Sequence, residues 1–328
     1  MREAPALQAA DPDLASMARQ AAFLLLQGRA DAAAALCGRI QAIDPNLETF
    51  GAFTDLLTWA RPRERLYPLV RALVDAGFAN PRSFDLLAAT AIWAGNIPAA
   101  RELTSPERFL SITRLHGPDD PDLAPLVAEL ASGLEHYDRP GDRSIRMGSR
   151  RNHLEQSDSP VLRRLLDRLW RVACDYVDRL PADPANPFLR TRPAGFVLKA
   201  WSVVSGAKTH HLPHLHATSW VNGVYYAEVP PVVADVAVVA GVTGRPGWLR
   251  VGPAAGRGFA ATGDGDGPEG GTDRIGWDER WIRPEPGLVV LMPSHFTHET
   301  VPLGCDQRRI CVAFELHPAA ADQAGHRP

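Results

Sequence analysis

The sequence has few cysteines, no long hydrophobic run and no dense block of positive charge. Its four cysteines among 328 residues lack the spacing of a metal site, which favours reduced, buried thiols in a cytoplasmic protein. No uninterrupted apolar run could span a bilayer, and the N-terminal segment lacks the basic and apolar regions of a secretory signal. The net charge of −3 and the absence of a Lys/Arg block argue against a nucleic-acid partner. We therefore expect a soluble cytoplasmic protein with no membrane contact.

The first 115 residues have the periodicity of helices. Apolar residues recur there at steps of three and four in an Ala/Leu-rich background, and the similar runs GRADAAAAL and GNIPAAREL begin at Gly28 and Gly95. Identical residues also recur 34 positions apart: Asn46 and Asn80, Phe50 and Phe84, Trp59 and Trp93. This period resembles that of tetratricopeptide (TPR) repeats, which present a concave surface to a protein or peptide partner. We predict a TPR-like helical domain over residues 1–115; the alternative is a plain helical bundle without a peptide groove.

A polar segment and one long helix follow. Residues 116–159 are rich in Asp, Pro and Arg, and we interpret them as a connector with one helix around residues 123–134. An amphipathic helix is predicted over residues 161–180, because one stripe is apolar and the arginines lie opposite. We expect this helix to begin the C-terminal domain, residues 160–318, and residues 319–328 to form a flexible tail.

After Pro193 the apolar residues alternate with a period of two, as in strands. Several short strands with few helices predict a sandwich or barrel. A Gly/Asp-rich stretch over residues 252–278 is expected to be a loop at the mouth of this barrel. The predicted strands cover residues 196–204, 220–229, 233–240, 287–292 and 308–316.

Six of the eleven histidines fall in two groups, which suggests a metal site. On a strand, His214 and His216 share one face, so both imidazoles can point at one ion. His298 follows a later strand and a turn, and can return to the same point across a rolled sheet. Three ligands in this facial arrangement leave positions for a chelating cosubstrate and O₂. The remaining three are not expected to bind the metal. We interpret His210 and His211 as turn or rim residues, and His295 as an exposed residue or one that lies behind the ligands.

Two adjacent arginines begin the last apolar strand. A guanidinium inside a barrel needs a carboxylate partner, and the distal carboxylate of 2-oxoglutarate would supply one. Arg308 and Arg309 point to opposite faces of the strand, so only one of them can bind the cosubstrate. We favour Arg309, because Cys311 and Ala313 share its face and leave room for a small ligand.

Three stretches together resemble a known family: HLHATSWVNGVYYAEVP (214–230), EPGLVVLMPSHFTHETVP (285–302) and RRICVAFEL (308–316). They are similar to the 2-oxoglutarate–Fe(II) oxygenases often found behind tetratricopeptide repeats in bacteria. The resemblance covers about half of the chain and implies an α+β protein in which TPR-like helical hairpins precede a double-stranded β-helix (jelly-roll or cupin-like) barrel. It also implies O₂-dependent hydroxylation of a C–H bond in a peptide, protein or small molecule, with 2-oxoglutarate converted to succinate and CO₂. The implied iron ligands are His214, His216 and His298, the 2-oxoglutarate residue is Arg309, and no further catalytic side chain is expected.

The sequence departs from the family pattern in ways that bear on the site. Asn222 stands where serine is usual and, with Tyr225, is a candidate for lining the cosubstrate pocket. No Asp or Glu occurs from residue 199 to 227, whereas most such oxygenases use two histidines and a carboxylate. Either the site has three histidines, or a carboxylate such as Glu228 or Asp235 joins it. The alternative functions are a cupin-like three-histidine dioxygenase that does not use 2-oxoglutarate and a non-catalytic TPR-type adaptor.

Overall fold

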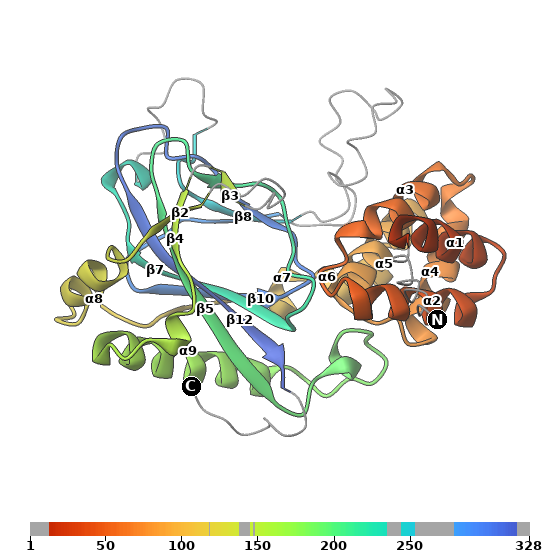
Figure 1. The fold of residues 1–328 in the computed structure, drawn as a ribbon, viewed down its shortest axis with the longest axis horizontal. Coiled ribbons are helices and arrows are strands. Elements are labelled where there is room, and N and C mark those ends of the chain that lie inside the picture. Colours follow the sequence, from red (N-terminus) through yellow and green to blue (C-terminus); the bar gives the residue numbers. More distant parts are fainter. Residues whose placement is uncertain are drawn as a thin grey trace, which may run out of the picture.

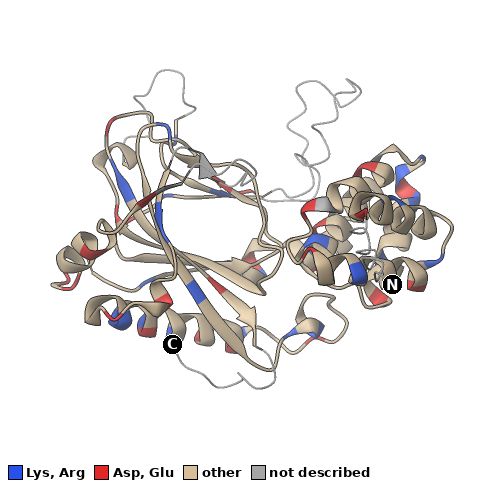
Figure 2. Cartoon of the chain, viewed as in Figure 1, with Lys and Arg blue, Asp and Glu red and all other residues tan. Residues whose placement is uncertain are grey.

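The computed structural model describes residues 13–117, 119–137, 145–146, 148–234, 244–252 and 279–319 of the chain. Helices at the N-terminus lie beside an antiparallel β-structure that is flanked by two further helices (Figure 1). Among the residues described, no helix is both long and apolar enough to cross a membrane. Acidic and basic residues are interspersed along the helices (Figure 2).

The N-terminal part is helical, as predicted. Gly28 and Gly95 have positive φ angles and allow the tight turns between the helices on either side of each, a conformation that glycine adopts without steric cost. Asp13, Asn80 and Asn96 cap helices by accepting hydrogen bonds from backbone N–H groups of the first turn. The helices are α1 (Leu14–Leu26), α2 (Ala30–Ile43), α3 (Gly51–Trp59), α4 (Leu66–Asp75), α5 (Pro81–Trp93), α6 (Ile97–Thr104) and α7 (Pro106–Phe109), with 3-10 turns at Glu48–Phe50 and Arg63–Arg65.

The β-structure is built on one seven-stranded antiparallel sheet with the order β1-β10-β7-β12-β5-β4-β2. A three-stranded sheet, β11-β8-β9, and a two-stranded pair, β3-β6, accompany it. This arrangement of helices and antiparallel strands is consistent with the double-stranded β-helix that the resemblance implies. The strands are β1 (Ser111–Arg114), β2 (Glu135–Tyr137), β3 (Ile145–Arg146), β4 (Gly148–Arg151), β5 (Phe196–Ser205), β6 (His210–His211), β7 (Val221–Glu228), β8 (Leu249–Val251), β9 (Arg280–Ile282), β10 (Leu288–Pro293), β11 (His298–Thr300) and β12 (Arg309–Pro318).

Helices α8 (Leu123–Leu130) and α9 (Pro160–Arg179) lie against the large sheet (Figure 1). The apolar stripe predicted for α9 is buried, and the Tyr176 hydroxyl near its C-terminal end donates a hydrogen bond to the Phe109 carbonyl oxygen at 2.7 Å. Each buried leucine of this stripe contributes about 1.5–3 kcal/mol to folding. The helix therefore ties the sheet to the end of the N-terminal helices.

Several strands lie in segments that the sequence did not identify as strands. β1 lies within the predicted helical domain, and β2, β3 and β4 lie within the predicted connector, where only α8 was expected. These strands are short and polar, so they show no apolar alternation.

Gly287, with φ +81°, lies against the segment that follows β1. Its carbonyl oxygen accepts a hydrogen bond from the Leu115 N–H at 2.7 Å, and a Cβ at this position would collide with the His116 carbonyl group.

Other predicted segments fall partly outside the described residues. The predicted strand over residues 233–240 begins in a 3-10 turn, Pro231–Val233, and continues from residue 235 outside the described residues. Most of the predicted loop over residues 252–278 and of the tail over residues 319–328 also lies outside them. The remaining 3-10 turns are Leu154–Gln156 and Leu189–Thr191.

His295 connects the β-structure to the helices, which differs from both expectations for this residue. It is 1% exposed, and its ring packs between Phe84 of α5 and Phe188. Its Nε2–H donates to the carbonyl oxygen of Leu103 in α6 at 2.8 Å, because a carbonyl can only accept. Burial lowers the pKa of His295 to about 4, against a smaller opposing effect of this hydrogen bond.

We expect this histidine to make the protein sensitive to mild acid. In the unfolded chain its pKa returns to about 6.5, so unfolding takes up a proton between pH 6.5 and 4, and stability falls as the pH falls through this window. The loss should reach about 3 kcal/mol at pH 4. His295→Gln, which keeps a side-chain donor, should flatten the dependence of the unfolding free energy on pH in denaturant titrations. His153→Gln, at an exposed position, is the control; equal flattening there would contradict the assignment.

Candidate metal and cosubstrate site

The backbone brings the two histidine groups of the sequence together. His214 and His298 form an isolated antiparallel bridge, with N–H···O distances of 3.1 and 2.9 Å in the two directions. The His216 N–H donates to the carbonyl oxygen of Ser294, the residue directly after β10, at 3.0 Å. His214 and His216 thus lie in the segment between β6 and β7 rather than on a regular strand. The bridge nevertheless places this segment beside β11. His298 therefore comes close to His214 and His216, as predicted.

Interactions at Nδ1 fix the orientation of each of the three imidazoles. Nδ1 of His214 donates to the Leu212 carbonyl oxygen at 2.7 Å, and Nδ1 of His298 donates to the Phe296 carbonyl oxygen at 3.0 Å. His216 Nδ1 faces the carboxylate of Glu315. Because each proton sits on Nδ1, each Nε2 presents a lone pair, which is the form of histidine that binds a metal ion.

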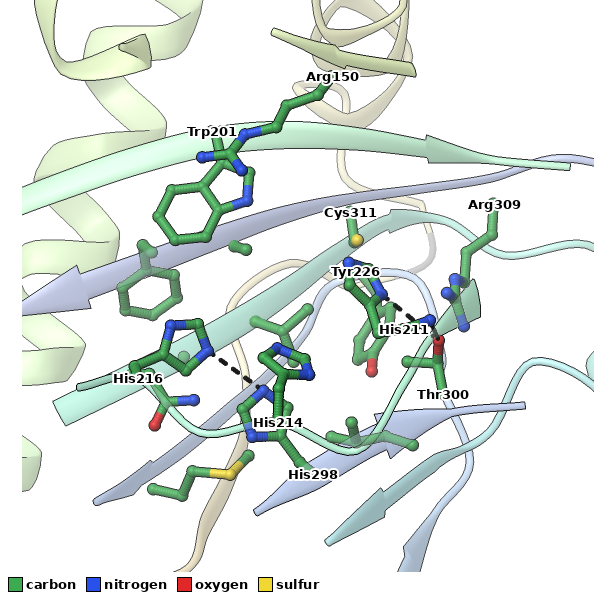
Figure 3. A pocket seen from close by; sticks show the side chains of 17 residues that line it. Arg150, Trp201, His211, His214, His216, Tyr226, His298, Thr300, Arg309 and Cys311 are labelled. Atoms are coloured by element: carbon green, nitrogen blue, oxygen red, sulfur yellow. Dashed lines mark hydrogen bonds between the residues drawn. The ribbon is translucent and has the colours of Figure 1, made fainter. Parts of the chain in front are cut away.

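The distances between the imidazoles fit a divalent ion. Nε2 of His216 and Nε2 of His298 are 3.3 Å apart (Figure 3), and the candidate ligand atoms of His214, His216 and His298 lie within 4.8 Å of one another. Two nitrogens about 2.1 Å from one ion and at right angles to each other would be about 3 Å apart. Burial, followed by the neighbouring His214 and His216, lowers the pKa of His298 well below its ordinary value, which keeps that ring neutral. The three side chains can therefore hold a metal.

A carboxylate lies behind one of the three histidines, on the side of its ring that faces away from the other two. Glu315, on β12, contacts Nδ1 of His216, on the ring edge opposite the cavity. Burial alone would raise the pKa of Glu315, but its interactions with His216 and His317 lower it below its ordinary value. Of the two carboxylates suggested from the sequence, Glu228 binds Arg308 and Asp235 lies outside the described residues.

A cavity of about 670 Å³, open volume at its mouth included, adjoins the histidines. The backbone alternation of β12 turns Arg309, Cys311 and Ala313 toward it, and that of β7 does the same for Asn222 and Tyr226 (Figure 3). Apolar side chains complete much of the wall: Val224, Leu249, Met292 and Phe314.

Arg309 is a buried cation with unused hydrogen-bonding capacity. It is 1% exposed, its Nη1 donates to the Gly247 carbonyl oxygen, and its Nη2 donates to Ser205 Oγ at 3.4 Å. Its Nε and the buried hydroxyl of Tyr226 have no hydrogen-bond partner among the described residues. Buried donors without partners are costly, so they mark a place where an anionic ligand such as a carboxylate fits.

Two sequence candidates lie away from the cavity. Arg308 points to the outside, where its Nε binds a Glu228 carboxylate oxygen at 2.8 Å, as expected if Arg309 faces inward. Tyr225 was expected to line the pocket, but its hydroxyl is 2.9 Å from His116 Nδ1 on the opposite face of β7. Tyr226 takes its place. Since strand residues alternate, the choice of Asn222 as a pocket residue already implied Tyr226 rather than Tyr225.

Three further residues line the cavity. His211, expected at a turn or rim, stacks on His214 with ring centres 5.7 Å apart. Burial, followed by the neighbouring His214, lowers the pKa of His211 well below its ordinary value. The Arg150 guanidinium lies 4.4 Å from the centre of the Trp201 ring, which also faces the cavity. Arg150 belongs to the predicted connector, where no pattern indicated it, whereas the pairing of β4 with β5 carries it to the site.

The fold and the geometry define a class of protein: an antiparallel β-structure with a candidate metal site of three imidazoles and a buried cation in the same cavity. Residues 199–315 match the family model described as "Putative 2OG-Fe(II) oxygenase". This segment is therefore similar to the 2OG-Fe(II) oxygenases, a family whose cofactors are iron(II) and 2-oxoglutarate and which uses O₂ and a substrate. No curated protein matches the chain.

Solved structures give distant likenesses. A prolyl-4-hydroxylase from Pseudomonas putida is 17% identical, with 65% of this chain and 94% of that chain covered and a TM-score of 0.42. A Trichoplax adhaerens prolyl hydroxylase in complex with a hypoxia-inducible-factor peptide is 11% identical, with coverages of 72% and 91% and a TM-score of 0.42. HygX from Streptomyces hygroscopicus, with nickel and 2-oxoglutarate bound, is 16% identical, with coverages of 66% and 85% and a TM-score of 0.42.

Proposed function

We propose that the chain is an Fe(II)/2-oxoglutarate-dependent dioxygenase that hydroxylates a peptide, protein or small-molecule substrate. In this reaction O₂ and 2-oxoglutarate are consumed, one oxygen atom enters a C–H bond of the substrate, and succinate and CO₂ are released. One observation carries the proposal: a single cavity contains three Nε2 lone pairs and the buried, partly unpartnered Arg309.

The residues have distinct roles in this proposal. His214, His216 and His298 hold the iron, and Arg309 with Tyr226 binds the distal carboxylate of 2-oxoglutarate through charge-assisted hydrogen bonds. When bound, iron and 2-oxoglutarate supply the oxidising power that attacks an unactivated C–H bond. The apolar wall excludes water from the reacting groups. No acid–base side chain is assigned, because the family's chemistry needs none beyond the metal site.

We further propose that α1–α6 are degenerate TPR-like hairpins that bind a protein or peptide partner. Trp59 and Trp93, 34 residues apart, are each the last residue of a helix, which supports an underlying repeat. Trp59 is 63% exposed and Phe23 of α1 is 58% exposed, so this part of the chain offers apolar side chains to a partner.

The test is an anaerobic titration of the Fe(II)-loaded protein with 2-oxoglutarate. Chelation of iron by the keto acid should produce a weak visible metal-to-ligand charge-transfer band that saturates at one equivalent. The Zn(II)-loaded protein, whose closed d shell gives no such band, is the control. Iron binding without the band would contradict the proposal and favour the three-histidine dioxygenase that does not use 2-oxoglutarate.

A further inference from the structure

We propose that Glu315 and His317 are positioning residues for His216, and that together they supply the negative charge missing from an all-histidine ligand set. This inference rests on the proposed function, because it assigns His216 to the metal. Neither residue emerged from the sequence patterns, and neither touches the cavity.

The geometry joins the three side chains in a row. One carboxylate oxygen of Glu315 contacts His216 Nδ1, and the other lies 2.6 Å from His317 Nε2. The side chains of Glu315 and His317 are each 12% exposed, and that of His216 is 16% exposed. Glu315 and His317 are two residues apart on β12, so they share one face of the strand. The carboxylate therefore sits between two rings with little access for water.

His216 differs in this respect from the other two imidazoles. Nδ1 of His214 and Nδ1 of His298 each donate to a neutral backbone carbonyl oxygen. Only His216 donates to an ionised group. A carboxylate on the far nitrogen makes an imidazole a stronger electron donor and fixes its orientation. We infer that His216 acts as the charged member of the ligand set, in place of the directly bound carboxylate that such iron sites commonly contain.

His317 has a separate task in this arrangement. By donating to the second oxygen of Glu315, it holds the carboxylate plane toward His216 and prevents rotation of the glutamate side chain. Loss of His317 should therefore weaken the effect of Glu315 without removing its charge. Because His317 acts through Glu315, the effects of substituting the two residues on metal affinity should not be additive.

The experiment compares Glu315→Gln, His317→Gln and the double variant with the wild-type protein. The matched control is Glu228→Gln, because Glu228 on the neighbouring strand β7 binds Arg308 on the outside of the sheet. Fe(II) and Co(II) affinities are measured by anaerobic competition with a chelator, together with the visible spectrum of the Co(II) form and the melting temperature of each metal-free variant.

We expect Glu315→Gln to lower metal affinity by about 10- to 100-fold, as is typical for residues that orient a metal-bound histidine. His317→Gln should lower it less, and the double variant should resemble Glu315→Gln. The Co(II) spectrum should shift with Glu315→Gln and stay unchanged with Glu228→Gln. In the Fe(II)–2-oxoglutarate complex, the charge-transfer band should move to higher energy, because the iron receives less electron density.

The outcomes separate this inference from the proposed function. If the wild-type protein binds no Fe(II), the proposed function fails. If the wild type binds Fe(II) and forms the charge-transfer band, but Glu315→Gln retains full affinity and an unchanged spectrum, the positioning role is overturned. A lower melting temperature alone, with affinity unchanged, would likewise overturn it and leave Glu315 a purely structural partner of two histidines.

Discussion

His298→Ala should abolish iron retention. His298 comes from a different part of the chain than His214 and His216, and its Nε2 lies 3.3 Å from that of His216. Without it, two imidazoles on one short segment must hold a labile divalent ion alone, so the loss should exceed the 10- to 100-fold typical of residues that only orient a ligand. The backbone bridge to His214 does not use the imidazole, so the fold should survive.

Iron content after desalting, and Fe(II) affinity measured anaerobically, would test this prediction. His210→Ala is the matched control, because Nδ1 of His210 is bonded to the Lys208 carbonyl oxygen and this residue does not line the cavity. Full iron occupancy in His298→Ala would remove His298 from the site. Loss of iron in His211→Ala, with His298→Ala unaffected, would show that His211 is the third ligand.

Arg309→Ala should leave iron binding intact and weaken 2-oxoglutarate binding by about 2–4 kcal/mol, roughly 30- to 1000-fold. The guanidinium is buried, and its unpartnered Nε lies in the same cavity as the Tyr226 hydroxyl, so a carboxylate there would be shielded from water. Arg309→Lys should give an intermediate loss, because an ammonium keeps the charge and loses the planar fork. The half-saturation concentration of the charge-transfer band measures the effect.

Arg308→Ala is the control for this substitution. Arg308 is adjacent in sequence but binds Glu228 on the outer side of the sheet, so its removal should leave 2-oxoglutarate affinity unchanged. Melting temperatures of both variants would separate a loss of binding from a loss of folding. If Arg308→Ala weakened the binding of 2-oxoglutarate and Arg309→Ala did not, the assignment of the cosubstrate pocket to the side of β12 that Arg309 faces would be wrong.

The sequence predicted those parts of the fold that have strong periodicity. The amphipathic pattern of α9 and the apolar alternation of β5, β7, β10 and β12 reflect burial, so they were visible in the residues themselves. β2 and β4 were missed because they are short and polar, and only the pairing of β4 with β5 and of β2 with β4 makes them strands. Their existence depends on tertiary contacts, which no local pattern records.

The candidate site was predictable to a similar degree. Its three histidines have distinctive spacing, whereas Glu315 lies 99 residues from His216 and resembles an ordinary polar residue of an alternating strand. Its proximity to His216 depends on where β12 lies relative to the segment between β6 and β7. Arg150 could not be predicted either, because only the pairing of β4 with β5 brings it to the site. Tyr226 could have been predicted as a pocket residue from the sequence, because alternate residues of a strand share one face and Tyr226 is four residues from Asn222.

Strand β1 has a consequence for how this chain can be divided. It pairs with β10 along the register Ser111↔Leu291 to Arg114↔Leu288, so the last residues of the predicted helical domain form an edge of the seven-stranded sheet. A cut at residue 115 would remove that edge and expose the backbone of β10, an open template for aggregation. It would also remove the Leu103 carbonyl that receives the His295 hydrogen bond. The part of the chain that contains the large sheet is therefore not a detachable module that begins at residue 116. If the helices were exchanged for those of another protein, β1, Phe109 and the residues around Leu103 would have to be kept together with the sheet.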